Sequence, residues 1–154
     1  MPSFTHFDEA GKAIMADVSE KEPSVRQAKA EGRIKMSAVC YKALQGDTVE
    51  KGDVLGVARI AGILAVKQTP ALIPLCHTLP IEKAAIDFDF DENNREIRAI
   101  CTVKATAVTG VEMEALTGVS ISLLTIYDMC KSLDKDMALS GIRLLEKTGG
   151  KTGG

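Results

Sequence analysis

Apolar and polar residues alternate most regularly in the middle of this chain. The stretches 86–91 and 97–105 each place an apolar residue at every second position, on either side of a short polar turn at Asn93-Asn94. Two alternating runs joined in this way predict a β-hairpin. Residues 26–36 alternate as well, with small and aliphatic residues on one face, and this pattern predicts a half-buried strand. Its opposite, solvent-facing set is Gln27, Lys29, Glu31, Arg33 and Lys35.

Helical spacing marks three other stretches. We expect a short helix over 37–44, a second over 54–67 with Asp53 as N-cap, and a third over 112–133 with one broad apolar stripe. The second helix is expected to be buried, because it carries small residues that let another backbone approach closely. These are Gly56, Ala58, Ala61, Gly62 and Ala65. A last strand is predicted over 141–147.

Two segments lack a regular period. Three prolines between Thr69 and Pro80 predict a rigid apolar loop instead of a long helix or strand. The first 20 residues show no sustained pattern and are expected to be irregular, and residues 148–154 form a glycine-rich tail expected to be flexible.

The order of these elements defines a fold class. Strand, helices, hairpin, helix and strand correspond to the β-α-β-β-α-β arrangement of a ferredoxin-like sandwich, an α+β fold with helices on one face of an antiparallel sheet. A chain of 154 residues has the size of one ordinary domain, so we expect a single catalytic or binding domain over 1–154.

Charge and cysteine usage narrow the possible partners. The 19 Lys and Arg residues nearly balance 21 Asp and Glu residues, which argues against nucleic acid or an anionic membrane as partner. The longest uncharged run, Ala115 to Tyr127, is shorter than the roughly 20 apolar residues that span a bilayer. The four cysteines lie far apart with no framework spacing, so we expect reduced thiols in a cytoplasmic protein.

Three motifs that suggest ligands fail when they are compared in detail. Gly150-Lys151-Thr152 ends like a phosphate loop, but the motif's first glycine would fall on Leu145 and no helix follows. The aspartates of 87–91 lack the glycine and glutamate that a calcium loop requires. His77 beside Cys76 has no partner pair with ligand spacing, so no metal site is predicted.

Asp128 and Lys131 are the strongest candidates for chemistry. They lie three residues apart on one face of the third helix, and the commoner explanation of such a spacing is a surface ion pair of little energetic value. However, Asp128 interrupts an apolar run, where an unpaired carboxylate is costly. A carboxylate and an ammonium in a partly desolvated site could transfer protons, because burial raises one pKa and lowers the other.

Two further residues admit a functional and an ordinary explanation. His77 lies in the proline-braced loop, where it could contact a ligand or merely bond to backbone. Arg26 is in phase with the buried face of its strand, which suits a cation at the rim of a site, although fraying at a strand end is as good an explanation. No serine-hydrolase or zinc-protease motif occurs and no cysteine has an identifiable catalytic base, so covalent catalysis has no support.

Long stretches of the chain resemble one known family. They include "MADVSEKEPSVRQAKAEGRIKM", "KGDVLGVARIAGILAVKQTPALIPLCH", "TGVEMEALTGVSISLLTIYDMCKSLDKDM" and "KTGGKTG". They are similar to the molybdenum-cofactor biosynthesis protein C family of cyclic pyranopterin monophosphate synthases. The resemblance implies that a cyclised dihydroguanosine triphosphate is converted to cyclic pyranopterin monophosphate with release of diphosphate.

The resemblance also implies roles for individual residues. Asp128 would be the catalytic acid or base, with Lys131 beside it. The residues expected to contact substrate are Leu75, Cys76, His77, Met113, Glu114, Lys51, Arg26, Lys67, Glu112 and Lys147. No cofactor is expected to be required, whereas Mg²⁺ accompanying the triphosphate is left open. The family further implies a homohexamer, a trimer of dimers, with each site between subunits.

Spacing along the third helix agrees with a shared site. Glu114 and Asp128 are fourteen residues apart, which is roughly 21 Å along a continuous helix, too far for one small substrate to reach both. The other function classes are a ligand-binding module in which the same cations hold a nucleotide unchanged, and a purely structural oligomer. The fold alone does not separate these from an enzyme.

Overall fold

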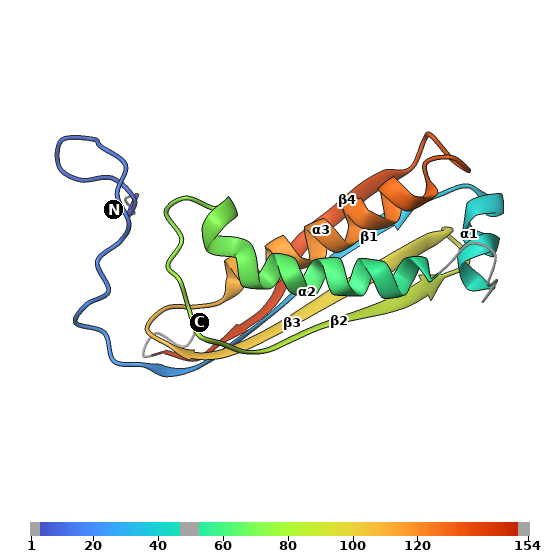
Figure 1. The fold of residues 1–154 in the computed structure, drawn as a ribbon. Coiled ribbons are helices and arrows are strands. Elements are labelled where there is room, and N and C mark those ends of the chain that lie inside the picture. Colours follow the sequence, from blue (N-terminus) through green and yellow to red (C-terminus); the bar gives the residue numbers. More distant parts are fainter. Residues whose placement is uncertain (1–3, 47–52, 151–154) are drawn as a thin grey trace.

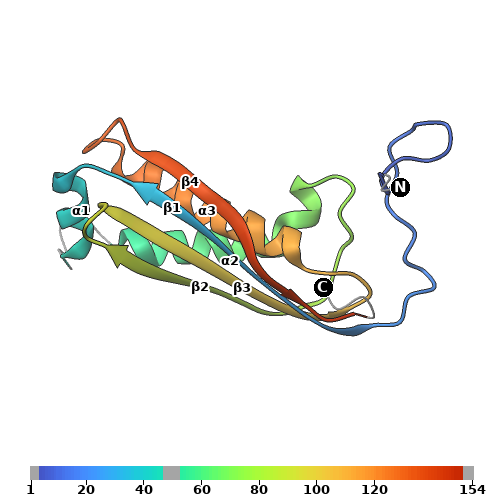
Figure 2. The same ribbon diagram turned by 180° about the vertical axis from the view of Figure 1, so that it is seen from behind.

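A four-stranded antiparallel sheet carries two long helices on one face. The computed structural model describes residues 4–46 and 53–150. Its elements are β1 (Ser24–Lys35), α1 (Ala38–Gln45), α2 (Val54–Leu72), β2 (Ile81–Asp91), β3 (Glu96–Ala107), α3 (Glu112–Cys130) and β4 (Ala138–Thr148). The strand order is β2-β3-β1-β4, and α2 and α3 cover the same face while the opposite face stays open (Figures 1 and 2). The predicted α+β, ferredoxin-like sandwich is confirmed.

The alternating residues of the strands form the core, as their period predicts. Ala28, Ala30 and Ile34 of β1 are fully buried, and so is every second residue of β3, namely Ile97, Ala99, Cys101, Val103 and Ala105. On the helix side, Val119, Leu123 and Ile126 of α3 are fully buried. Residues one position apart point to opposite faces of a strand, so this register directs one face of each central strand at the helices.

The molecule is elongated and its two ends differ. The start of β1, the end of β3, the start of α3 and the end of β4 meet at one end, which we call the arm end because residues 4–23 extend from it (Figure 1). At the opposite end, which we call the α1 end, α1 lies near the β2–β3 turn and the C-terminus of α3 (Figure 1).

Two glycines allow α2 and α3 to approach closely. A Cβ atom on Gly118 would lie 2.8 Å from both Cys101 Sγ and Val66 Cγ2, and one on Gly62 would lie 3.0 Å from the Gly118 carbonyl oxygen. These distances are shorter than van der Waals contact, so no larger residue fits at either position without movement. The prediction of close backbone packing on the second helix is confirmed here.

The second helix continues beyond its predicted end. It runs through Pro70 to Leu72, so the prediction of an irregular loop from Thr69 is wrong for 69–72. Pro70 has no amide hydrogen, so the bond that this position would donate to the Val66 carbonyl is missing from the last turn. The Thr69 hydroxyl adds a bond of its own to the Ala65 carbonyl at 2.8 Å.

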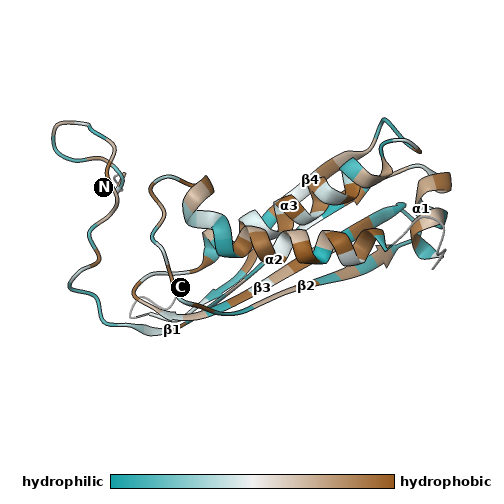
Figure 3. Ribbon diagram, viewed as in Figure 1, coloured by the Kyte–Doolittle hydropathy of each residue, from teal (hydrophilic) through white to brown (hydrophobic). Residues whose placement is uncertain are grey.

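One face of α2 is exposed, contrary to the expectation that this helix is buried. Val57, Ile60 and Leu64 are 45%, 62% and 51% exposed, and Leu124 of α3 is 51% exposed. Hydrophobic residues colour the side of both helices that faces away from the sheet (Figure 3). A two-layer fold covers only the sheet side of its helices, so this apolar stripe has no partner in the part of the chain that the structure describes.

The last helix ends earlier than predicted, and the last strand begins earlier than predicted. The third helix ends at Cys130 instead of 133 because Leu133 and Asp134 both donate backbone bonds to the Cys130 carbonyl and close a turn. The last strand starts at Ala138, not 141, and includes Thr148, the first residue of the predicted tail. Residues 151–154 of that tail lie outside the described residues.

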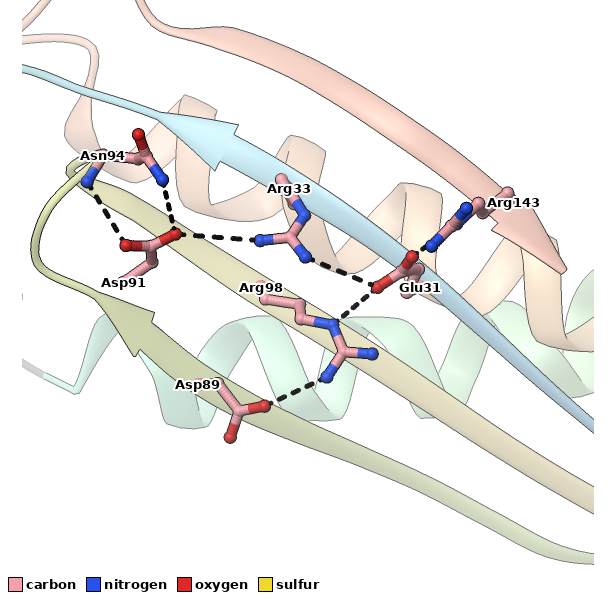
Figure 4. Close-up of polar contacts among 7 residues, drawn as sticks. All are labelled: Glu31, Arg33, Asp89, Asp91, Asn94, Arg98 and Arg143. Carbon is pink, nitrogen blue, oxygen red and sulfur yellow. Dashed lines mark hydrogen bonds and ion pairs between the residues drawn. The ribbon is translucent and has the colours of Figure 1, made fainter. Parts of the chain in front are cut away.

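A carboxylate is buried on the open face of the sheet, although the alternating pattern of the sequence predicted that it would be exposed to solvent. The Glu31 side chain is 3% exposed, and it pairs with Arg98 at 2.6 Å and Arg143 at 2.5 Å. Arg33 lies 3.8 Å away, and the cluster continues through Asp89 (Figure 4). The bond from Arg98 outweighs the opposing effect of burial and lowers the pKa of Glu31. The expectation of a solvated face is therefore wrong at Glu31, because three long cations cover it.

Candidate functional site

A buried carboxylate and a thiol meet at the arm end. Glu114, in the first turn of α3, is 1% exposed, and Cys76 Sγ, from the loop after α2, donates to its Oε2 at 3.7 Å. Its Oε1 is buried with no hydrogen-bond partner among the described residues. Burial raises the pKa of Glu114. Burial, together with the Glu114 charge, raises the pKa of Cys76 to about 11, so this thiol stays protonated near neutral pH.

A second carboxylate lies beside them and carries a lysine. Lys147 Nζ of β4 is 3.4 Å from Glu112 Oε1, and both side chains are about one-third exposed. The other oxygen, Glu112 Oε2, is buried without a partner in the described part of the chain. A Cβ on Gly110 would collide with the Glu112 carboxylate and the Lys147 stem. The absence of a side chain at Gly110 therefore allows this pair to close over the β3–α3 turn.

Arg26 forms the cationic rim of the same end. Its Nε and Nη2 donate to the carbonyls of Ala107 and Val108 at 3.2 Å, which fixes the guanidinium plane at the end of β3. Gly150 packs against the guanidinium so closely that a side chain there would overlap it. A cavity of about 440 Å³ lies beside this contact, bounded in part by Lys21, Arg26 and Gly150. The spacing of these residues in the chain gives no sign of this arrangement.

The remaining predicted contact residues differ in how far they are buried. His77 is half-buried, and its Nε2 lies 2.7 Å from the Ala16 carbonyl oxygen. Leu75 and Met113 are half-buried as well, and Lys67 is exposed near the end of α2. Lys51 lies outside the described residues.

Asp128 and Lys131 are at the opposite end of the molecule. Lys131 Nζ bonds to Asp128 Oδ1 at 2.8 Å, but the two side chains are 62% and 72% exposed. The hydrogen bond that Lys131 donates to Asp128 raises the pKa of Lys131. The expectation that this pair is desolvated, and that the pKa of the lysine is lowered, is therefore wrong for the single chain. The reason is that the polar side of α3 faces solvent here. A cavity of about 300 Å³ opens beside the pair between Leu55 and Met129.

The structure thus divides the predicted residues into two groups. The arm-end group holds carboxylates, a thiol, an imidazole and two cations, and it comes from four segments of the chain, namely β1, the loop after α2, the start of α3 and β4. The α1-end group holds the Asp128–Lys131 pair. Because α3 is unbroken from Glu112 to Cys130, the groups are held roughly 21 Å apart. Cavities of this size accept small ligands; one borders Arg26 of the arm-end group, and the other borders Met129, next to Asp128 in the chain.

The sequence analysis did not identify Gly110 or the Ala16 carbonyl as parts of this group. The Thr109-Gly110 pair marks a turn before the helix and was an available signal for Gly110. A backbone carbonyl has no sequence signal, because every residue carries one.

Neither a metal-ligand cluster nor a membrane span is found in the described residues. No three His, Cys, Asp or Glu side chains among them are placed to bind one metal ion. No helix in the ranges 4–46 and 53–150 is long and apolar enough to cross a bilayer.

Comparison with known proteins gives one consistent result. The family model described as "MoaC family" matches residues 15–150. A protein of Pelobacter propionicus named cyclic pyranopterin monophosphate synthase is 53% identical over 98% of this chain and 94% of its own length. Proteins of the same name from Clostridium perfringens and Cereibacter sphaeroides are 53% and 54% identical, over 97% and 99% of this chain and 94% and 96% of their own.

Proposed function

We propose that this chain, which belongs to the MoaC family, acts as a lyase of molybdenum cofactor biosynthesis. It converts (8S)-3',8-cyclo-7,8-dihydroguanosine 5'-triphosphate to cyclic pyranopterin monophosphate and releases diphosphate. The observation that supports this most directly is the convergence of Cys76, Glu112, Glu114 and Lys147 from distant parts of the sequence. Chains about half identical over nearly their whole length carry the name of this activity.

The arm-end group suits a ligand that has both a polar ring system and phosphates. Two orphaned carboxylate oxygens, on Glu112 and Glu114, can accept bonds from ring N–H groups. We propose that Leu75, Met113 and His77 complete the contact with the ring. Lys147 and Arg26, with Lys67 and Lys51, supply charge for the phosphates.

Asp128 and Lys131 supply the proton transfers. The reaction removes a diphosphate group and rearranges a ring that the substrate already contains, so it requires proton movement and charge neutralisation more than a redox group. We propose Asp128 as the acid or base and Lys131 as its cationic partner. Their exposure in one subunit is resolved if a neighbouring subunit covers them, because burial at an interface would then shift both pKa values toward neutrality.

The assembly that meets this need is a homohexamer, a trimer of dimers. A two-fold axis can bring the arm-end group of one subunit against the α1-end group of its partner. The unpartnered apolar stripe of α2 and α3, with Ile60 and Leu124 half or more exposed, supports association through the helix layer as well.

We propose no required cofactor for this reaction, and Mg²⁺ only as a companion of the triphosphate. We propose a cytoplasmic location, because the four cysteines lie far apart in the sequence with no spacing typical of a disulfide framework.

One assay tests the proposed function. Purified protein is incubated with the cyclised triphosphate, and diphosphate and pterin are quantified together, with and without Mg²⁺. Equal amounts of both products are expected. Substrate that binds but is recovered unchanged would indicate a nucleotide-binding module, and no binding would indicate a structural oligomer.

A further inference from the structure

The N-terminal arm contacts the site through one hydrogen bond. Residues 4–23 extend away from the sheet and helices (Figure 1), and most of their hydrogen bonds are internal. Asp8 Oδ1 accepts from the amides of Ala10 and Lys12, and Ile14 donates to the His6 carbonyl. The exception is the Ala16 carbonyl oxygen, which lies 2.7 Å from His77 Nε2.

The turn that follows Ala16 fixes the direction of this carbonyl. Asp17 Oδ1 accepts from the Ser19 amide at 2.9 Å and from the Ser19 hydroxyl at 2.6 Å. These bonds close the backbone immediately after Ala16 into a turn stabilised by its aspartate. The carbonyl is therefore presented to His77 by a locally ordered segment, although the arm beyond it stands free of the body.

The identity of the acceptor determines the form of the imidazole. A carbonyl oxygen only accepts hydrogen bonds, so His77 Nε2 must carry the proton. In the neutral ring, Nδ1 is then the nitrogen with a free lone pair, and no partner for Nδ1 occurs among the described residues. The same loop is tied to the carboxylate cluster, because Cys76 Sγ lies 3.6 Å from the His77 carbonyl and 3.7 Å from Glu114 Oε2.

We propose that the arm is a positioning element for the site: the Ala16 carbonyl orients the His77 ring and holds it with the proton on Nε2 and Nδ1 as the acceptor. This proposal rests on the proposed function only in taking His77 as a substrate contact. It implies that the substrate offers a donor, a ring N–H or a hydroxyl, to His77 Nδ1. It also assigns a role in the reaction to a backbone carbonyl of the arm.

Ring ¹⁵N spectroscopy tests the hydrogen bond independently of activity. The chain has two histidines, so a His6→Gln variant of the full chain leaves a single ring signal, that of His77. At mildly alkaline pH, where imidazole is neutral, this variant is expected to show an Nε2–H proton that exchanges slowly with water. Deletion of residues 2–19, which removes both this carbonyl and the turn that presents it, should abolish the slow exchange, and Asp17→Ala should weaken it. An Nδ1–H tautomer in the His6→Gln chain, or equal exchange with and without the arm, would overturn the proposal.

A kinetic cycle tests whether the arm acts through His77. The deletion is expected to lower kcat/KM by about tenfold in the otherwise unchanged chain, since misplacement of one contact is costly. In a His77→Ala background, it should cost nothing further, and His6→Gln should match the unchanged chain. An equal loss in both backgrounds would refute a role through His77. If His77→Ala itself is fully active, the assignment of His77 to the site fails, whatever the ring spectrum shows.

Discussion

Two buried glutamates of this protein differ in pKa and in role because their surroundings differ. Glu114 and Glu31 are both almost completely buried, yet burial raises the pKa of Glu114, whereas the arginines around Glu31, Arg98 above all, lower its pKa. The first carboxyl group has a buried oxygen with no hydrogen-bond partner among the described residues, and the second is paired with arginines. The first is thus suited to binding and the second to stability.

Replacement of Asp128 by Asn tests the proposed proton transfer. The amide keeps the shape of the side chain but cannot exchange a proton at neutral pH, so kcat is expected to fall by at least about 100-fold. Steady-state assays of diphosphate release measure this, and an unchanged melting temperature would show that folding is retained, as expected for an exposed side chain. Turnover close to that of the unchanged chain would leave Asp128 as a surface residue.

Replacement of Glu31 by Gln should destabilise the open face of the sheet. The change leaves Arg98 and Arg143 without their carboxylate, and the expected loss is about 2 kcal/mol in urea unfolding at pH 7. Asp89→Asn is the matched control: Asp89 pairs with the same Arg98, at 3.2 Å, but its side chain is 63% exposed. This control should change stability by only a few tenths of a kcal/mol.

The same variant should alter the dependence of stability on pH. The pKa of Glu31 is lowered by folding, so its contribution is complete above the ordinary glutamate pKa of about 4.3 and is lost as pH falls below it. The difference in unfolding free energy between the two chains should therefore shrink as the medium becomes acidic. A difference that stays constant or grows toward low pH would contradict this account.

Among the elements, α3 has the greatest influence on the site. It begins with Glu112 and Glu114, crosses α2 at Gly118, and ends next to Asp128. Its straight, unbroken course keeps the two groups of residues apart, and its close contact with α2 at the two glycines sets the spacing of the helix layer over the sheet.

Gly118→Ala tests this crossing. Alanine favours a helix by about 1 kcal/mol over glycine, but its Cβ would lie 2.8 Å from Cys101 Sγ and Val66 Cγ2, and overpacking costs about 1–3 kcal/mol. We expect a net loss of about 1 kcal/mol in chemical denaturation. Cys101→Ala removes one of the two crowded atoms, so the double variant should be more stable than the sum of the single changes predicts. If the two changes in unfolding free energy simply add, the added Cβ does not clash with Cys101, and the two helices move apart to accommodate it.

At the scale of the whole molecule, the residues proposed for the site fall into two separate groups. Helix α3 spans most of the length between them (Figure 1), and the proposed chemistry requires both at one substrate. A symmetric dimer would bring both groups to one substrate with no change in the fold of the subunit. A two-fold axis places the arm end of each subunit against the α1 end of its partner, so the same contact occurs twice.

Mixed oligomers provide the test of a shared site. Inactive Asp128→Ala chains are refolded together with inactive Glu114→Ala chains. Random pairing makes half of the dimers mixed, and one of the two sites in each mixed dimer is intact, so about a quarter of normal activity should return. Mass spectrometry verifies the mixing. Mixtures as inactive as either parent would place both residues at a site within one chain, or one of them at no site.

The sequence alone determined the elements and their order. Alternation at 97–105 and helical spacing from 112 onward are local consequences of strand and helix geometry, and they predicted the hairpin, α3 and the ferredoxin-like arrangement. Asp53 was also identified correctly, since its side chain accepts from the Gly56 amide at 2.8 Å. The residues of the family's motifs, which include Cys76, His77 and Glu114, could also be identified from the sequence, because each motif is a contiguous stretch of the chain.

Only the tertiary structure decided what surrounds each residue. The burial of Glu31 depends on arginines from neighbouring strands, and the exposure of Asp128 depends on which side of α3 lacks a covering layer. The contacts of Cys76 with Glu114 and of His77 with Ala16 join residues 38 and 61 positions apart. Desolvation and hydrogen bonding depend on neighbours in space, so a one-dimensional pattern predicts which face a residue occupies but not which groups meet it there.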